Sequence, residues 1–352
     1  MKIADVDTPA ILVDTARAEA NLARAQAYAD THGLTLRPHI KTHKLPMWAA
    51  RQVALGAAGI TCQKIGEAEV MADASITDIF IPYNILGAAK LERLAALHAR
   101  VALSVAADSA VTVAGYAARF DDPARPLPVL IEIDTGAKRC GVSSLPDLVE
   151  LARAIDAAPG LVFEGIMTYP PRGRTADVNA KLGEAAGVLK AAGLPPRRIS
   201  NGGSPDLYHA AEVTNATEHR PGTYIYSDRM QVAFGLGHLS DCALTVLATV
   251  VSHPVPGRVV LDAGSKALAA DAAPVPGHGY LVEYPDAIVT SLSEEHAVVD
   301  VSDCPTAPAI GERVRVIPNH VCVVSNLFEV VHLVDGDTVK EVVPVAARGR
   351  LG

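Results

Sequence analysis

The stretch that decides the fold is residues 34–44, which read L-T-L-R-P-H-I-K-T-H-K. The short apolar run at 34–36 is typical of a strand, and Lys41 follows it closely. Arg37, His43 and Lys44 flank this lysine, and neighbouring cations with partial desolvation disfavour an ammonium and leave a nucleophilic amine. Lys41 is therefore a candidate Schiff-base lysine. Taken alone, the segment is more simply interpreted as a solvated basic loop. The rest of the chain decides between that loop and a Schiff-base lysine.

Beyond this stretch, short strand-like runs alternate with longer amphipathic runs as far as residue 228. Gly or Pro separates most units, and Ser109 and Ser144 stand where helix N-caps are expected. Eight such units in roughly 200 residues predict a parallel (β/α)8 barrel. An open doubly wound sheet is the alternative, but no GxGxxG turn follows the first strand. The expected strands are 34–40, 59–65, 78–84, 101–106, 129–134, 161–169, 198–202 and 223–227; the expected helices are 45–55, 66–74, 88–99, 109–118, 145–157, 176–192 and 205–213.

The composition changes near Gly237. The rest of the chain consists of β-branched runs that Pro, Gly and Asp interrupt, without a long helical pattern, which predicts an all-β domain. An isolated strand at 8–14 is expected to pair with it, because a lone strand needs a sheet. We therefore expect a barrel domain at 18–236 and a β domain made of 1–17 plus 237–352. The expected strands of the β domain are 242–252, 258–262, 297–301, 312–318, 321–324, 328–334 and 340–345.

The composition of the 352-residue chain argues against several classes of protein. A formal net charge of -8, without a long basic block, argues against a surface for nucleic acid or anionic membranes. No apolar run reaches membrane-spanning length, and the first residues lack a signal-peptide core. The five cysteines are scattered and imply no disulfide framework, so a reducing cytoplasm is the expected compartment.

Polar side chains stand at nearly every predicted strand end, which is where active sites gather in barrels. The turn at 200–204 contains Gly202 and Gly203, whose backbone N–H groups can approach an anion at the start of a helix. Together with Lys41, this turn suggests a phosphate-bearing cofactor that a lysine holds covalently, and pyridoxal phosphate meets both demands. Other strand ends present Gln63, Tyr83, Asn84, Asp134, Tyr169 and Tyr224.

A candidate metal motif, His320-Val321-Cys322, lies in the predicted β domain. Residues i and i+2 of a strand project from the same face, so the imidazole and the thiolate are expected to converge. That pair of ligands favours zinc over magnesium and leaves positions for water or substrate. The alternative is a buried cysteine beside a hydrogen-bonded histidine.

In the order and spacing of its motifs, the chain resembles the fold-type III pyridoxal-phosphate enzymes of the D-threonine aldolase and D-serine dehydratase family, which are relatives of alanine racemase. The resemblance covers essentially the whole chain. It implies a (β/α)8 barrel, a C-terminal β domain, and a homodimer whose active sites lie between the barrel of one subunit and the β domain of the other. It rests on segments 8–10, 37–44, 134–136, 139–141, 202–205, 220–224, 262–266, 294–296 and 318–322.

The resemblance also implies roles for particular residues. Lys41 looks like the lysine that forms the Schiff base, and Arg139 looks like the arginine that neutralises the phenolate oxygen of the cofactor. His320 and Cys322 look like the ligands of a divalent metal, with zinc expected and manganese or magnesium as alternatives. The cofactor contacts expected from the sequence are Lys41, Gln63, Arg139, Tyr169, Ser200, Gly202, Gly203, Ser204 and Tyr224.

One position departs from the family pattern. Many relatives carry a histidine near the end of the sixth strand, where it can act as a second base, but segment 165–171 reads G-I-M-T-Y-P-P. Tyr169 or His43 is expected to fill that role beside Lys41. All three are therefore candidate catalytic residues.

The resemblance implies a lyase that acts on small β-hydroxy-D-amino acids. Retro-aldol cleavage to glycine and an aldehyde is preferred, because segments 168–169 and 326–328 look more like the aldolase branch. Dehydration to a 2-oxo acid and ammonia, as in D-serine dehydratase or D-3-hydroxyaspartate dehydratase, is the alternative. Cys322 favours it, since aldolase-type members often pair the metal histidine with a carboxylate. An amino-acid racemase would need no metal, and a non-catalytic pyridoxal-phosphate carrier would lack the β domain.

Overall fold

The computed structural model describes residues 1–352, which form two compact units. The first, here called the barrel unit, comprises Ala25–Lys41, Pro46–Gly222 and Arg350–Gly352. The second, the β unit, comprises Met1–Arg24, Thr42–Leu45 and Thr223–Gly349. Helix α1 (Thr15–Thr31) begins in the β unit and ends in the barrel unit.

The barrel unit is built on an eight-stranded sheet in the order β2-β9-β8-β7-β6-β5-β4-β3, and all of its pairs are parallel. The two edge strands are joined as well, since the Thr61 N–H donates to the Pro38 carbonyl over 2.7 Å and His39 bridges Thr61. The predicted (β/α)8 fold is therefore confirmed. Its strands are β2 (Thr35–Leu36), β3 (Ile60–Thr61), β4 (Asp78–Ile81), β5 (Ala102–Ala107), β6 (Leu127–Glu132), β7 (Leu161–Met167), β8 (Arg198–Asn201) and β9 (Glu218–His219).

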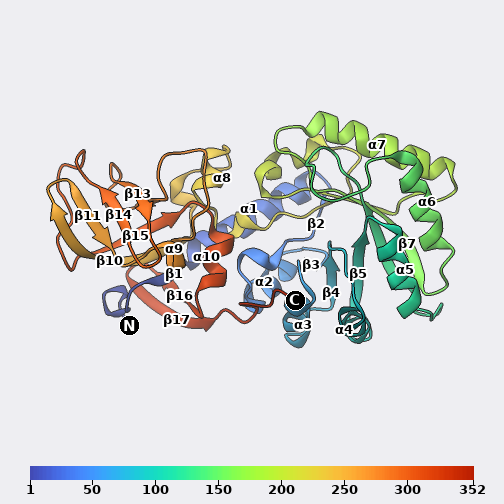
Figure 1. The fold of residues 1–352 in the computed structure, drawn as a ribbon, viewed down its shortest axis with the longest axis horizontal. Helices are drawn as coiled ribbons and strands as arrows, with labels where there is room; N and C mark the ends of the chain where they lie inside the picture. Colours follow the sequence, from blue (N-terminus) through green and yellow to red (C-terminus); the bar gives the residue numbers. More distant parts are fainter. The chain divides into compact units, whose positions relative to one another are not determined.

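Helices connect successive strands, and α4–α7 lie outside the sheet (Figure 1). Ser109 and Ser144 cap two of them, because their side chains accept the backbone N–H groups of Thr112 and Asp147. Pro46–Ala54 forms α2, Ile65–Asp73 forms α3, Ala88–His98 forms α4, Ala110–Arg119 forms α5, Leu145–Asp156 forms α6 and Thr175–Ala191 forms α7. The expected helix at 205–213 is the 3-10 helix η3 (Ser204–Glu212).

The predicted eighth strand is wrong. Residues 223–227 form no strand and contain the 3-10 helix η4 (Thr223–Ile225), whereas the eighth strand is β9, Glu218–His219. Its side chains are polar yet buried, because Glu218 accepts a hydrogen bond of 2.7 Å from Arg37 inside the barrel. A two-residue strand of buried polar residues carries no apolar pattern, so sequence periodicity misses it.

The β unit contains a nine-stranded sheet that includes the N-terminal strand. Strand β1 (Ala10–Asp14) pairs antiparallel with β10 and parallel with β16, which confirms the expected pairing of the isolated strand. Val6, Leu12, Leu247 and Val334 belong to one apolar cluster of this unit. The other strands are β10 (Leu244–Val255), β11 (Arg258–Leu261), β12 (Gly279–Leu281), β13 (Ile288–Leu292), β14 (Ala297–Asp300), β15 (Arg313–Pro318), β16 (Val330–Asp335) and β17 (Thr338–Pro344).

The β unit also corrects the expected environment of the metal motif. The predicted strand at 321–324 is instead helix α10 (Val321–Leu327), with His320 as its extended N-cap residue. His320 and Cys322 therefore do not share one face of a strand. The short helix α9 (Ser265–Leu268) also interrupts the predicted all-β pattern, and α8 (Arg229–Ala233) belongs to the β unit although it precedes the predicted β domain.

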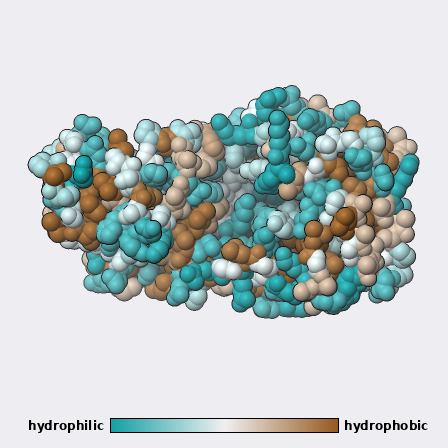
Figure 2. Space-filling model, viewed as in Figure 1, coloured by the Kyte–Doolittle hydropathy of each residue, from teal (hydrophilic) through white to brown (hydrophobic).

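The surface is of mixed polarity. On the face drawn in Figure 2, hydrophilic residues are interspersed with apolar ones. The most exposed large apolar side chains, Val111 and Ile310, lie far apart in the sequence. None of the helices combines the length and the apolar character needed to cross a bilayer.

Candidate active site

Lys41 lies in the 3-10 helix η2 (Ile40–Thr42), just beyond the carboxyl end of β2. Its backbone N–H donates to Nδ1 of His39 over 3.4 Å. The other ring nitrogen of His39, Nε2, lies 3.0 Å from Oε1 of Gln63, which follows β3. The structure thus brings two residues predicted from sequence, Lys41 and Gln63, to neighbouring strand ends, with His39 between them.

The glycine turn follows β8 on the same sheet. Gly202 has a φ of +103°, and a Cβ atom there would lie 2.0 Å from the His219 ring. A Cβ atom on Gly203 would lie 2.9 Å from the ring of Tyr169. Gly202 therefore requires glycine, for which close approach and left-handed backbone cost little, whereas a side chain at Gly203 would displace the Tyr169 ring.

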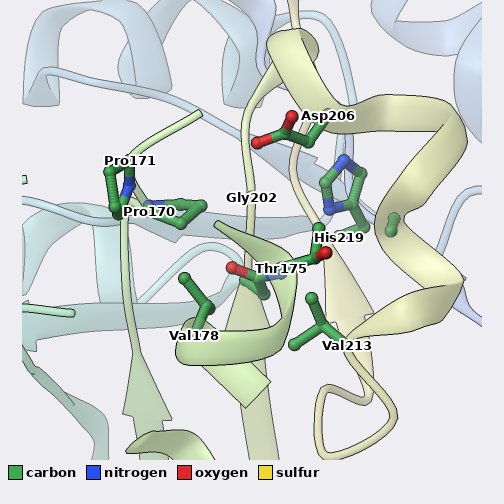
Figure 3. Close-up of a pocket in the computed structure, with 10 residues that line it drawn as sticks. Pro170, Pro171, Thr175, Val178, Gly202, Asp206, Val213 and His219 are labelled. Atoms are coloured by element: carbon green, nitrogen blue, oxygen red, sulfur yellow. The ribbon is translucent and has the colours of Figure 1, made fainter. Parts of the chain in front are cut away.

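Figure 3 shows the back of this turn, where Pro170, Val178, Val213 and His219 surround a hollow of about 10 Å³. A space of that size holds a single water at most. Packed side chains therefore close the back of the turn. A ligand would have to bind on the other side of the turn.

A larger hollow of about 310 Å³ lies beside the turn and includes Tyr169 and Gly203 in its lining. Arg139, from the segment after β6, places its guanidinium carbon 4.5 Å from the centre of the Tyr169 ring. Three residues predicted from sequence thus meet at the ends of β6, β7 and β8. Tyr169 and Gly203 line the hollow, and Arg139 contacts it only through the Tyr169 ring.

The barrel unit fits pyridoxal phosphate on these observations. Gly203 presents backbone without a side chain to the lining of the larger hollow, as a phosphate site of backbone N–H groups requires. Lys41 supplies an amine from another strand end of the same sheet, and Arg139 supplies a half-exposed cation.

Four other predicted residues are less accessible. Ser200 is fully buried and bonds to Glu218 and, over 2.6 Å, to Arg220. His43 is fully buried, with its Nδ1 accepting the Leu45 N–H over 3.0 Å. Ser204 accepts the N–H of Gly222 over 3.0 Å, and Tyr224 lies buried in η4 of the β unit.

Arg220 is a functional candidate that the sequence reasoning did not single out. It directly follows β9, is 4% exposed, and donates to the Thr168 carbonyl over 2.9 Å and to Ser200. Burial lowers its pKa to about 10. A buried cation at the end of a barrel strand indicates a functional site. The sequence pattern predicts the eighth strand at 223–227, so it does not place Arg220 at a strand end.

The metal motif lies in the β unit, where other side chains surround it. His320 Nδ1 is 2.8 Å from Oδ2 of Asp228. Cys322 Sγ lies 3.1 Å from Oγ1 of Thr42 and 3.7 Å from Oγ1 of Thr223. Burial alone would lower the pKa of His320, but hydrogen bonds from its imidazolium to Asp228 and Cys322 raise it to about 11. The two side chains thus converge, although a helix start and not a strand brings them together.

The donor set of this motif fits a divalent metal. An imidazole and a thiol within hydrogen-bonding reach of each other match the ligands that zinc prefers. The Asp228 carboxylate on the far nitrogen of His320 is a common companion of metal-binding histidines.

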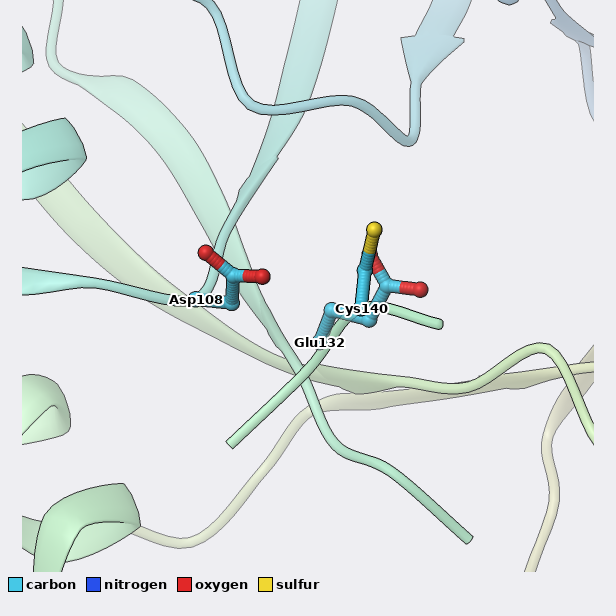
Figure 4. A group of neighbouring side chains, drawn as sticks. All are labelled: Asp108, Glu132 and Cys140. Atoms are coloured by element: carbon cyan, nitrogen blue, oxygen red, sulfur yellow. The ribbon is translucent and has the colours of Figure 1, made fainter. Parts of the chain in front are cut away.

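A second group of possible ligands, Asp108, Glu132 and Cys140, lies in the barrel unit (Figure 4). Its ligand atoms are all within 4.8 Å of one another. Burial and the nearby Glu132 carboxylate raise the pKa of the Cys140 thiol. Two carboxylates and one thiol mix hard and soft donors, which suits zinc less well than an imidazole with a thiol, so this group is the weaker metal candidate.

Comparison with known proteins defines the class. Residues 13–230 match the alanine racemase N-terminal domain, and residues 243–334 match the putative serine dehydratase domain. A D-threonine aldolase of Arthrobacter sp. is 37% identical, with 99% of this chain and 94% of that protein covered. A D-threo-3-hydroxyaspartate dehydratase of Delftia sp. (strain HT23) is 31% identical, with 92% and 93% covered.

A relative of known structure has the same fold as this chain. The crystal structure of D-threonine aldolase from Filomicrobium marinum superposes with a TM-score of 0.92 at 32% identity, covering 99% of this chain and 98% of that one. These are lyases that depend on pyridoxal phosphate. The chain belongs to this family of alanine racemase-like pyridoxal-phosphate enzymes with a D-serine dehydratase domain.

Proposed function

We propose that this protein is a metal-dependent lyase that splits β-hydroxy-D-amino acids between Cα and Cβ, giving glycine and an aldehyde. The observation that carries the proposal is the 37% identity with a D-threonine aldolase over 99% of the chain. D-Threonine, which would give glycine and acetaldehyde, is the substrate to test first.

In this proposal the barrel residues hold the cofactor. Lys41 would hold it covalently, the turn at 202–204 would bind its phosphate, and Arg139 would supply a cation that neutralises its phenolate. When bound, pyridoxal phosphate supplies an electron sink for the bond that breaks at Cα. Tyr169 is better placed than His43 to take a proton from substrate, because Tyr169 is 37% exposed and lines the larger hollow, whereas His43 has no exposed surface.

The β unit holds the metal in this proposal, with His320 and Cys322 as its protein ligands. A divalent cation supplies Lewis acidity toward the β-hydroxyl group of the substrate. Zinc is the metal we expect, since the ligands are nitrogen and sulfur; manganese and magnesium are the alternatives. Two protein ligands leave open positions, as a catalytic site needs.

Dehydration is the second candidate function. It would convert the same substrates to a 2-oxo acid and ammonia, and two features favour it. The metal pair contains a thiol, and the D-threo-3-hydroxyaspartate dehydratase is nearly as similar as the aldolase. Identifying the products from D-threonine decides between them. Acetaldehyde with glycine supports the aldolase, and 2-oxobutanoate with ammonia supports the dehydratase.

We also propose a homodimer, from the family resemblance. Light scattering on the purified protein tests the assembly, and a fully active monomer would contradict it. The five cysteines are free thiols, in keeping with the cytoplasmic location that we propose.

A further inference from the structure

Asp228 is a fully buried carboxylate in the β unit, and both of its oxygens are occupied. Oδ1 accepts the Gln231 N–H over 2.8 Å, at the start of α8. Oδ2 accepts the Val321 N–H over 3.1 Å and lies 2.8 Å from His320 Nδ1. The carboxylate thus connects α8 to the first turn of α10 and to His320.

These contacts decide which nitrogen of His320 keeps its proton when the other binds a metal. Both oxygens of Asp228 already accept backbone N–H bonds, so Oδ2 is an acceptor toward the ring as well and His320 Nδ1 is the donor. In the neutral imidazole the other nitrogen, Nε2, then keeps its lone pair for a metal. The Val321 N–H bond to the same oxygen holds the backbone of the metal motif against the carboxylate, so the ring cannot turn independently of the helix start.

We propose that Asp228 is a positioning residue for the metal site, which fixes the Nδ1–H tautomer and the orientation of His320 so that Nε2 binds the metal. The inference rests on the proposed function for His320 and Cys322 as metal ligands. It goes further by naming the residue that prepares one of these ligands before the metal arrives. Asp228 touches no substrate and acts only through His320.

The test is metal affinity, measured by competition between the metal-free protein and a chromophoric zinc chelator. Asp228→Asn keeps the shape of the side chain. Its amide can still accept one N–H bond, but its NH₂ group then faces His320 Nδ1 and favours the wrong tautomer. Removing such a partner typically weakens zinc binding about 10- to 100-fold. Asp241→Asn is the matched control, because Asp241 also accepts a backbone N–H in the β unit but contacts neither His320 nor Cys322.

The outcomes separate this inference from the proposed function. If His320→Ala and Cys322→Ala lose zinc binding while Asp228→Asn binds zinc like the wild type, the inference about Asp228 is overturned and the metal site stands. If His320→Ala binds zinc like the wild type, the metal site itself is wrong. Loss of affinity in Asp228→Asn but not in Asp241→Asn supports the inference.

A second measurement needs no change at Asp228, in case Asp228→Asn does not fold. Nitrogen-15 NMR of histidine-labelled, zinc-loaded wild-type protein reports which ring nitrogen of each histidine is protonated. The His320 signal is identified by its absence in His320→Ala. We expect a protonated Nδ1 and a proton-free Nε2. A protonated Nε2 would overturn the inference.

Discussion

The hydroxyl oxygen of Thr42 lies 3.1 Å from the sulfur of Cys322, and Thr42 is the residue that follows Lys41. Residues 280 positions apart are thereby in contact, and the first of them is adjacent in sequence to the proposed cofactor lysine. Thr42 and Cys322 both belong to the β unit, so the contact places a hydroxyl group beside a proposed metal ligand.

Thr42→Val tests the contribution of that contact. The change keeps the shape of the side chain and removes the hydroxyl, and a hydrogen bond of this kind contributes about 1 kcal/mol, or roughly fivefold in dissociation constant. We expect zinc affinity to fall by about that factor. Thr223→Val should have a smaller effect, because its hydroxyl is 3.7 Å from the same sulfur. Equal affinities for all three proteins would show that the hydroxyl contact does not matter for the metal.

Lys41 should carry pyridoxal phosphate as an imine. Other lysines are less suitable, since Lys44 is buried with its ammonium near the Ala347 carbonyl and Lys266 pairs with Glu295 over 2.6 Å. The hydrogen bond and charge of Glu295 raise the pKa of Lys266, which makes it a poorer nucleophile. Hydride reduction should remove the visible absorbance and leave the label on the Lys41 peptide. A label on Lys44 or Lys266 would refute the assignment.

Gly202→Ala should impair cofactor binding and destabilise the barrel unit. Its φ of +103° suits glycine alone, and the new Cβ would meet the His219 ring at 2.0 Å. We expect a loss of about 1–3 kcal/mol from the backbone alone, seen as a lower melting temperature and weaker titration of the cofactor-free protein. Gly187→Ala is the control, because a Cβ there meets nothing within 4 Å and the residue lies in α7. If both variants behave alike, the glycine turn has no special role.

The buried His219 predicts a dependence of stability on pH. Burial lowers its pKa to about 3 from a usual 6.5, so the folded state holds a neutral ring. Above about pH 6.5 neither state binds the proton. Below it the unfolded state does, so this contribution to stability is lost progressively as the pH falls toward 3. Melting temperatures between about pH 8 and pH 5 should therefore fall more steeply for the wild type than for His219→Phe. His209→Asn, at an exposed site, should keep the wild-type slope, and parallel curves for all three proteins would rule out His219 as the cause.

Most of the barrel could be predicted from sequence because its signals are local. Apolar runs alternate with amphipathic helices, and caps such as Ser109 and Ser144 stand at the expected positions. The eighth strand could not be predicted, because Glu218 and His219 are polar and the ion pair with Arg37, distant in sequence, is what lets Glu218 lie buried. Local pattern carries no information about such a partner.

The structure of the metal motif also could not be predicted from local sequence pattern. Val321, Val323 and Val324 are β-branched and favour a strand, yet they begin a helix. The bond from the Val321 N–H to Asp228 satisfies a helix-start donor from 93 residues away in the chain. The residue types of the candidate site were therefore readable from sequence, but their mutual geometry and their partners Asp228, Thr42 and Arg220 were not.

The most direct test of the account is the turnover of D-threonine by the purified holoenzyme, before and after exhaustive chelation and again after zinc is restored. We predict that glycine and acetaldehyde form in equal amounts only when metal is present. The cofactor absorbance and the melting temperature should change little on chelation, because the metal acts on the substrate and does not hold the fold. Turnover that continues unchanged without metal, or L-allo-threonine formed by inversion at Cα alone, would contradict the account and favour a metal-free racemase.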